Sequence, residues 1–201
     1  MAEPSWSNAL EALADNKFVL GDQLVDVGIS APELASALAA VAMAQGELGH
    51  ARHLYHWSHE LQGISKEIRA ESGKALSVLR HHENWIELMV SLLAVNVAAR
   101  VLLERLRQLN EAMVVSKTAK MLVEMAEHIT FAGEWCRRFR AETGAIPGLF
   151  QAALSRQSDA ICAWLRAVDA EIGGGSDMDM ANAFVREMEM VCGPVTVRHP
   201  A

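Results

Sequence analysis

The chain has 201 residues, of which 51% are hydrophobic and 5% aromatic, and a formal net charge of −7. This length suits one domain with a sizeable core, and the low aromatic content with only five prolines favours helices over sheets. No basic stretch offsets the acidity, which argues against a nucleic-acid partner. Three widely spaced cysteines form no Cys-x-x-Cys motif, so neither a disulfide framework nor a thiolate zinc site is expected.

Free thiols and the lack of a secretory pattern in the first residues predict a cytoplasmic protein. The most apolar segment, residues 86–103, is interrupted by Glu87, Asn96 and Arg100. These polar residues disfavour a membrane span and favour a helix that is buried in a bundle.

The first half of the chain is predicted to hold two helices and a connector. A short helix is expected over residues 16–27, and Gly28 ends it. Ser30 is expected to cap a second, longer helix that stops at Gly63. Residues 64–82 are expected to form a less regular connector with a possible helix of its own.

The second half is predicted to hold four helices. Apolar spacing places them at residues 84–109, 111–141, 149–172 and 178–191. The glycine-rich run GGGSD at 173–177 lacks the flanking residues of a phosphate-binding loop and is expected to be a flexible break.

Two pairs of a glutamate and a histidine stand out in these helices. Glu47 and His50 lie three residues apart in QGELGHAR, and Glu124 and His128 lie four apart in VEMAEHITF. Residues at either spacing project from the same face of a helix, so each pair can converge on one point. Carboxylate oxygen and imidazole nitrogen suit iron or manganese, which makes both pairs candidate metal ligands.

A Glu-x-x-His motif on each of two helices, with a carboxylate from each of two others, holds the dinuclear centre of ferritin-like bundles. The first pair fits this rule and the second misses it by one residue. The motifs therefore predict an all-α, ferritin-like four-helix bundle in a single domain, residues 1–201. Its core is expected at about residues 16–141, with additional C-terminal helices at about 149–191.

A dinuclear site needs two further carboxylates. Asp26 is one candidate, because its apolar neighbours predict a buried position on the first helix. The polar residues inside the third helix are Asn96, a poor substitute for a carboxylate, and Arg100. A guanidinium at this place could neutralise a buried Glu47 or Glu124 instead of leaving it for a metal.

Three segments resemble a known family. LGDQLVDVG, QGELGHARHLYHWSHEL and VEMAEHITFAGEW are similar to helices in the ferritin-like A and C subunits of the phenylacetyl-CoA epoxidase complex, which are phenylacetic acid catabolic proteins. The resemblance covers residues 17–140. It implies either an A-type subunit, whose di-iron centre epoxidises the aromatic ring of a CoA thioester, or a C-type subunit with a degenerate site that supports the A subunit.

The resemblance also implies roles for individual residues. Asp26 takes the place of the first-helix ligand, and Glu47 and His50 match the first ligand pair. His128 matches the second ligand histidine.

Two of the six expected ligands are altered. Asn96 stands where the family has an aspartate, and Met125 where it has a glutamate. Glu124 is one residue away, about 100° round the helix, and still shares one face with His128. A partial metal site and a pocket without metal both remain open.

The resemblance implies a subunit, or a close relative, of a ring-epoxidising aromatic-CoA multicomponent oxygenase with a partial or degenerate di-iron site. Such a chain would hold one or two irons, or none. Electrons would come from an external reductase, since the chain has no flavin or iron-sulfur motif. Expected partners are a related ferritin-like subunit or a second copy of the chain, with an aromatic acyl-CoA as substrate.

Two other functions stay open. One is a non-catalytic helical scaffold whose metal pocket is closed. The other is a ferritin-like metal oxidase or storage protein, which the asymmetric ligand set disfavours.

Overall fold

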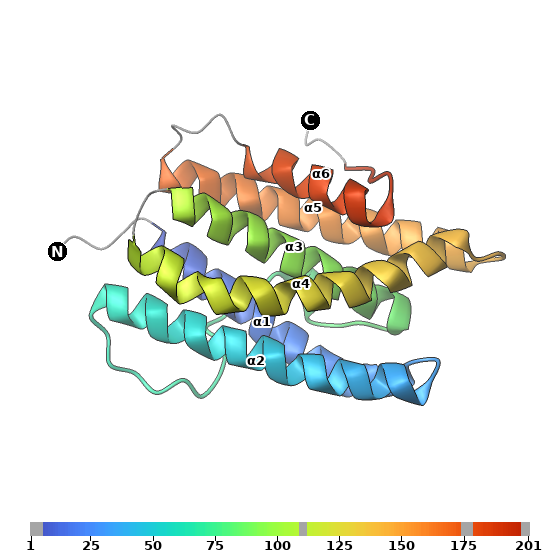
Figure 1. The fold of residues 1–201 in the computed structure, drawn as a ribbon, viewed down its shortest axis with the longest axis horizontal. Coiled ribbons are helices and arrows are strands. Elements are labelled where there is room, and N and C mark those ends of the chain that lie inside the picture. The colour runs from blue at the N-terminus through green and yellow to red at the C-terminus, as the bar shows by residue number, and fades with distance from the viewer. Residues whose placement is uncertain (1–5, 109–111, 174–178, 198–201) are drawn as a thin grey trace. The chain divides into compact units, whose positions relative to one another are not determined.

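The computed structural model describes residues 6–108, 112–173 and 179–197, and these residues form helices and irregular segments without a strand. The all-α class is therefore confirmed. The α-helices, shown in Figure 1, are α1 (Ser7–Asp26), α2 (Leu34–Gln62), α3 (Trp85–Gln108), α4 (Ala112–Ala141), α5 (Ile146–Ile172) and α6 (Met180–Cys192).

The beginning of the chain differs most from the prediction. Helix α1 starts at Ser7 instead of residue 16, because Leu10 and Leu13 continue its buried face and are 0% exposed. Ser30 does not cap α2. Its hydroxyl donates to the carbonyl of Val27 (2.7 Å) in a short 3-10 helix, η1 (Gly28–Ser30), and α2 begins only after Glu33.

Other boundaries follow the sequence closely. Gly63 ends α2 in the left-handed conformation (φ 67°), which a residue without a side chain adopts at little cost. The connector after it contains no α-helix and only one 3-10 helix, η2 (Ser77–Leu79). Pro147 lies in the first turn of α5, which begins before the predicted residue 149. Most of the predicted break at 173–177 lies outside the described residues.

The chain divides into two compact units, residues 1–85 with 170–174 and residues 86–169 with 175–201. The single domain stays a prediction. In the first unit, α1 and α2 form an antiparallel hairpin and pack along each other (Figure 1). Gly21 allows this close approach, since a Cβ atom there would lie only 2.8 Å from Cγ of Leu48.

The connector of the first unit is held in place by one buried carboxylate. Asp15 is 0% exposed and accepts hydrogen bonds from the backbone N–H groups of Ser72 (2.8 Å) and Lys74 (2.5 Å). The hydroxyls of Ser72 and Tyr55 donate to the same carboxylate. Because a buried carboxylate needs hydrogen-bond donors, these bonds hold the connector against α1 at Asp15.

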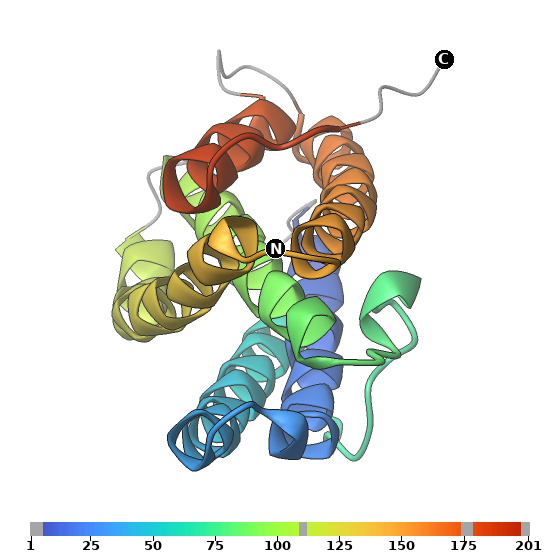
Figure 2. The same cartoon turned by 90° about the vertical axis from the view of Figure 1, so that its right-hand side faces the viewer.

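The second unit groups α3 to α6, which Figure 2 shows nearly end on. Ion pairs join α3 to two of its neighbours, Glu87 to Arg156 of α5 (2.8 Å) and Arg100 to Glu187 of α6 (2.5 Å). Helix α4 packs against α6. The interior is apolar, and 83% of the most hydrophobic 18-residue stretch of α3 is buried. Helix α3 is long and apolar enough to cross a membrane, but burial of this extent is typical of a core helix, as predicted.

Candidate metal centre

The first unit contains a buried ion pair at the predicted ligand Glu47. Nζ of Lys17, on α1, lies 2.8 Å from Oε2 of Glu47, on α2, and both side chains are 0% exposed. The close packing of the two helices at Gly21, one turn further along α1, brings the pair together. Lys17 is therefore the counter-ion of the glutamate that the sequence proposed as a metal ligand.

The ion pair balances two opposing effects. Burial lowers the pKa of the Lys17 ammonium, because a low-dielectric interior disfavours the charged form, while the neighbouring Glu47 carboxylate raises it again in part. The attraction between the two charges offsets part of the hydration that each of them loses on burial.

His50 follows Glu47 by three residues on α2 and is buried, with 4% of its surface exposed. Asp26, by contrast, is exposed at the last residue of α1, and its neighbour Val25 is 47% exposed. The predicted burial of Asp26 is thus wrong, because α1 ends in solvent at this point. The Asp26 carboxylate also raises the pKa of Asp22, one turn earlier, after the larger effect of partial burial.

The second unit holds the other predicted pair, on α4. His128 is 7% exposed, and Met125, at the position where the resemblance expects a glutamate, is 0% exposed. The side chain of Glu124 is 41% exposed and lies 3.3 Å from Lys120 along the same helix. The methionine faces the interior while the neighbouring glutamate is partly in solvent.

The polar residues of α3 have partners within the second unit. Asn96 is buried and donates from Nδ2 to the carbonyl of Leu92 (2.9 Å) on its own helix. Arg100 binds Oε2 of Glu187 from both Nε (2.9 Å) and a terminal nitrogen (2.5 Å). Arg100 is thus an ion-pair partner, but of Glu187, a residue that the sequence did not suggest.

Neither unit taken by itself presents a metal centre among its described residues. Among the described residues of either unit, no three His, Cys, Asp or Glu side chains gather as metal ligands do. A divalent cation on Glu47, about 4 Å from an ammonium, would be repelled by about 8 kcal/mol at an effective dielectric constant of about 20. As long as Lys17 is bound to Glu47, the Glu47 carboxylate is paired with an ammonium and is not a metal ligand.

Sequence reasoning missed Lys17, although a signal was present. Leu10, Leu13, Leu20 and Leu24 are all 0% exposed, and with Lys17 they form one stripe at alternating spacings of three and four residues. Such a stripe marks the buried face of a helix. A lysine inside it requires a buried carboxylate opposite, which a comparison with α2 would have found in Glu47.

The sequence matches the family model described as phenylacetic acid catabolic protein over residues 2–201. A search of curated proteins found no match. The matched region is longer than residues 17–140, for which the resemblance was visible in short motifs, and includes the C-terminal helices α5 and α6. The family implies a role in phenylacetate catabolism.

Proposed function

The chain belongs to the phenylacetic acid catabolic protein family, and from this premise we propose that it is a non-catalytic subunit of a ring-epoxidising aromatic-CoA oxygenase. The observation that carries the proposal is the buried ion pair between Lys17 and Glu47. It supports the C-type role that the resemblance implies, in which the subunit keeps the fold and assists a related subunit that does the chemistry.

The ion pair supports this role by its charge. In a metal site, the Glu47 carboxylate would coordinate a cation with two or more positive charges. Here an ammonium lies 2.8 Å from the carboxylate in an interior that water does not reach. The ammonium thus neutralises Glu47 in the place that a metal cation would take.

The second unit supports the proposal independently. The thioether of Met125 is buried where the family resemblance expects a carboxylate, and a soft sulfur ligand is a poor choice for iron in an oxygen-rich site. The amide of Asn96 carries no charge and is already bonded to the backbone of α3. Under this proposal the external reductase delivers its electrons to the related subunit, which also binds the acyl-CoA.

Exposed apolar side chains supply a surface for association. Ile29 (76% exposed), Leu34 (76%) and Leu38 (63%) follow one another from η1 into the first turns of α2. Large apolar side chains grouped in this way are typical of protein contact surfaces. We propose that this end of the hairpin meets the related ferritin-like subunit.

The first test is the iron content per chain of protein expressed in iron-supplemented medium, with His50→Ala as the control. We expect the two proteins to hold the same background amount of iron. About one iron lost in the control would indicate a single-metal site on Glu47 and His50, and about two would make the chain a catalytic subunit. Either loss would contradict the proposal.

The second test is co-purification with a di-iron subunit of the same family. We expect a stable complex with the unaltered chain and an affinity at least ~10-fold lower for Leu38→Asp, since a charge would have to be buried in the contact. Val123→Asp is the matched control, because Val123 is also exposed (67%) but lies on α4. A chain that forms no complex would contradict the subunit role.

A further inference from the structure

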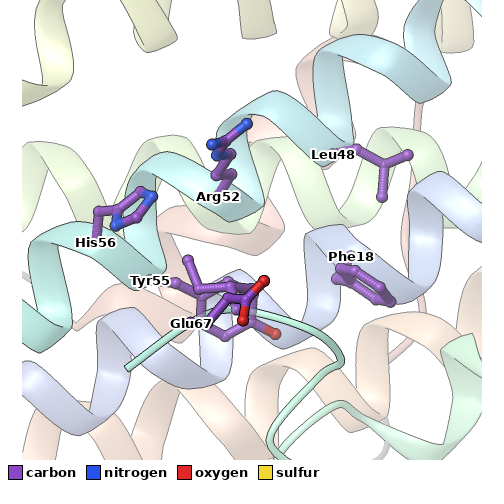
Figure 3. Close-up of a pocket in the computed structure, with 7 residues that line it drawn as sticks. Phe18, Leu48, Arg52, Tyr55, His56 and Glu67 are labelled. Carbon is purple, nitrogen blue, oxygen red and sulfur yellow. The ribbon is translucent and has the colours of Figure 1, made fainter. Parts of the chain in front are cut away.

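The first unit contains a cavity of about 470 Å³ between α1, α2 and the connector (Figure 3). This volume is in the range of sites that hold small organic ligands. Its lining combines aromatic, aliphatic and charged side chains, namely Phe18, Leu48, Arg52, Tyr55, His56, Glu67 and Ile68.

The cavity is separate from the Lys17–Glu47 ion pair. Phe18 directly follows Lys17 on α1, and Leu48 directly follows Glu47 on α2. One residue corresponds to a turn of about 100° round a helix, so the cavity side chains project in a different direction from the ion pair. Phe18 and Leu48 are partly exposed, whereas Lys17 and Glu47 are fully buried.

One part of the cavity wall is apolar. Phe18, Leu48 and Ile68 present carbon atoms only, and each is half-buried. Tyr55 adds its ring, but its hydroxyl donates to Asp15 and is therefore not available to a ligand. This wall suits the hydrocarbon part of a small molecule.

The polar part of the lining comes from two residues of α2 that lie one turn apart. Arg52 and His56 are exposed and line the cavity (Figure 3), and neither makes a hydrogen bond or ion pair with any described residue. The only acidic side chain in the lining, Glu67, is bound by Arg69 through Nε (2.9 Å) and a terminal nitrogen (2.6 Å). A guanidinium with free donors beside an imidazole therefore favours an anionic group.

We propose that this cavity binds a small organic carboxylate with an apolar body. Arg52 and His56 hold the carboxylate through the guanidinium and the imidazole. Phe18, Leu48 and the ring of Tyr55 contact the apolar body. The site goes beyond the proposed function, since a subunit that supports a catalytic partner needs no small-molecule site of its own.

The proposal is tested by calorimetric titration of the unaltered chain with two such carboxylates, phenylacetate and octanoate. We expect at least one of them to bind with a Kd on the order of 0.1–1 mM, as for ligands of about ten atoms. Phenylacetamide, which keeps the ring but has no charge, should bind at least ~10-fold more weakly, because it lacks a charge-assisted bond to Arg52. Inorganic phosphate, which has the charge but no apolar body, should show no measurable binding.

Variants connect the binding to the cavity. Arg52→Gln and His56→Gln should weaken the better carboxylate, Arg52→Gln by ~10-fold or more, and Ile68→Trp should abolish binding by filling the space. His53→Gln, an exposed histidine of α2 outside the lining, and Lys120→Gln, which removes one positive charge on α4, should leave the affinity unchanged. Circular dichroism of each variant shows that it is folded.

Three results would overturn the proposal. They are the absence of binding by both carboxylates, equal binding of phenylacetamide or phosphate, and an unchanged affinity in folded Arg52→Gln. None of them bears on the iron content or on complex formation, so a failure here is distinguishable from a failure of the proposed function.

Discussion

The two units of the protein place their charged side chains differently. In the first unit Asp15, Lys17 and Glu47 are all 0% exposed. In the second unit, Arg100 and Glu187 form an ion pair in which the side chains are 31% and 26% exposed, respectively. The apolar side chains of α3 fill the interior of this unit. The second unit also buries Arg105 (5% exposed), but its partner Asp169 keeps 23% of its side chain exposed, whereas in the first unit both members of the ion pair are fully buried.

The difference indicates what the buried charges are for. Removing two charges from water costs several kcal/mol per ion, so a well-packed apolar pair is often as stable as a buried ion pair. Stability alone therefore does not explain Lys17 and Glu47. A buried carboxylate inherited from a metal-binding relative, with a lysine in place of the metal, would account for the pair, as proposed above.

The largest effect is expected for Lys17→Met. The substitution leaves Glu47 buried without its counter-ion and should lower the free energy of unfolding by about 3–5 kcal/mol. Urea denaturation followed by circular dichroism measures this loss. A loss below about 1 kcal/mol would show that the glutamate reaches solvent or another cation, and would remove the contrast between the units.

The control for this prediction is the double variant Lys17→Met with Glu47→Leu. It removes both charges, so its unfolding free energy should return to within about 1 kcal/mol of the unaltered chain if the apolar side chains pack well. Additive losses in the two single variants would mean that the residues do not interact.

A medium effect is expected at Tyr55, whose hydroxyl donates to the buried Asp15 carboxylate. Tyr55→Phe should lower the free energy of unfolding at neutral pH by about 1.5–3 kcal/mol, the range for a hydrogen bond to a charged group. Three other donors, from Ser72 and Lys74, still satisfy Asp15 in this variant.

The same variant should change the pH dependence of stability. Burial, together with the bond to Asp15, raises the pKa of Tyr55 above its ordinary value. The folded protein thus keeps the phenol proton above pH ~10 while the unfolded chain releases it, and stability falls as the pH rises through this range. Denaturation curves from pH 8 to about 11 should show a smaller alkaline loss for Tyr55→Phe. An equal loss would place the hydroxyl in solvent.

The smallest effect is expected for Arg100→Gln in the second unit. Its ion pair with Glu187 is partly exposed, and pairs of this kind contribute about 0–1 kcal/mol. Urea denaturation should therefore place this variant within about 1 kcal/mol of the unaltered chain. A loss as large as that of Lys17→Met would show that both units depend on internal charges to the same extent.

Helix positions were predictable because they depend on local signals. Apolar spacing and the stop at Gly63 gave α2 to within a residue at its end, and the structure confirms α3 at Trp85–Gln108 against the predicted 84–109. The start of α1 was missed although Leu10 and Leu13 continue the spacing of Leu20 and Leu24, because the lysine at position 17 interrupts this apolar stripe. Asp26 was misjudged for the opposite reason, because apolar neighbours do not bury a residue at the exposed end of a helix.

The sequence by itself determined the helical class, the two Glu-His pairs and the family, because each depends on residue types at fixed short spacings. Tertiary structure alone decided the partner of Glu47. Lys17 is 30 positions away, and only the packing of α1 on α2 brings its ammonium within 2.8 Å of the carboxylate. The same packing decided that Asp15 binds the connector and that Arg52 and His56 stand beside a cavity. Hydrogen bonds and ion pairs act over a few ångströms, so residues far apart in sequence acquire them only when the chain has folded.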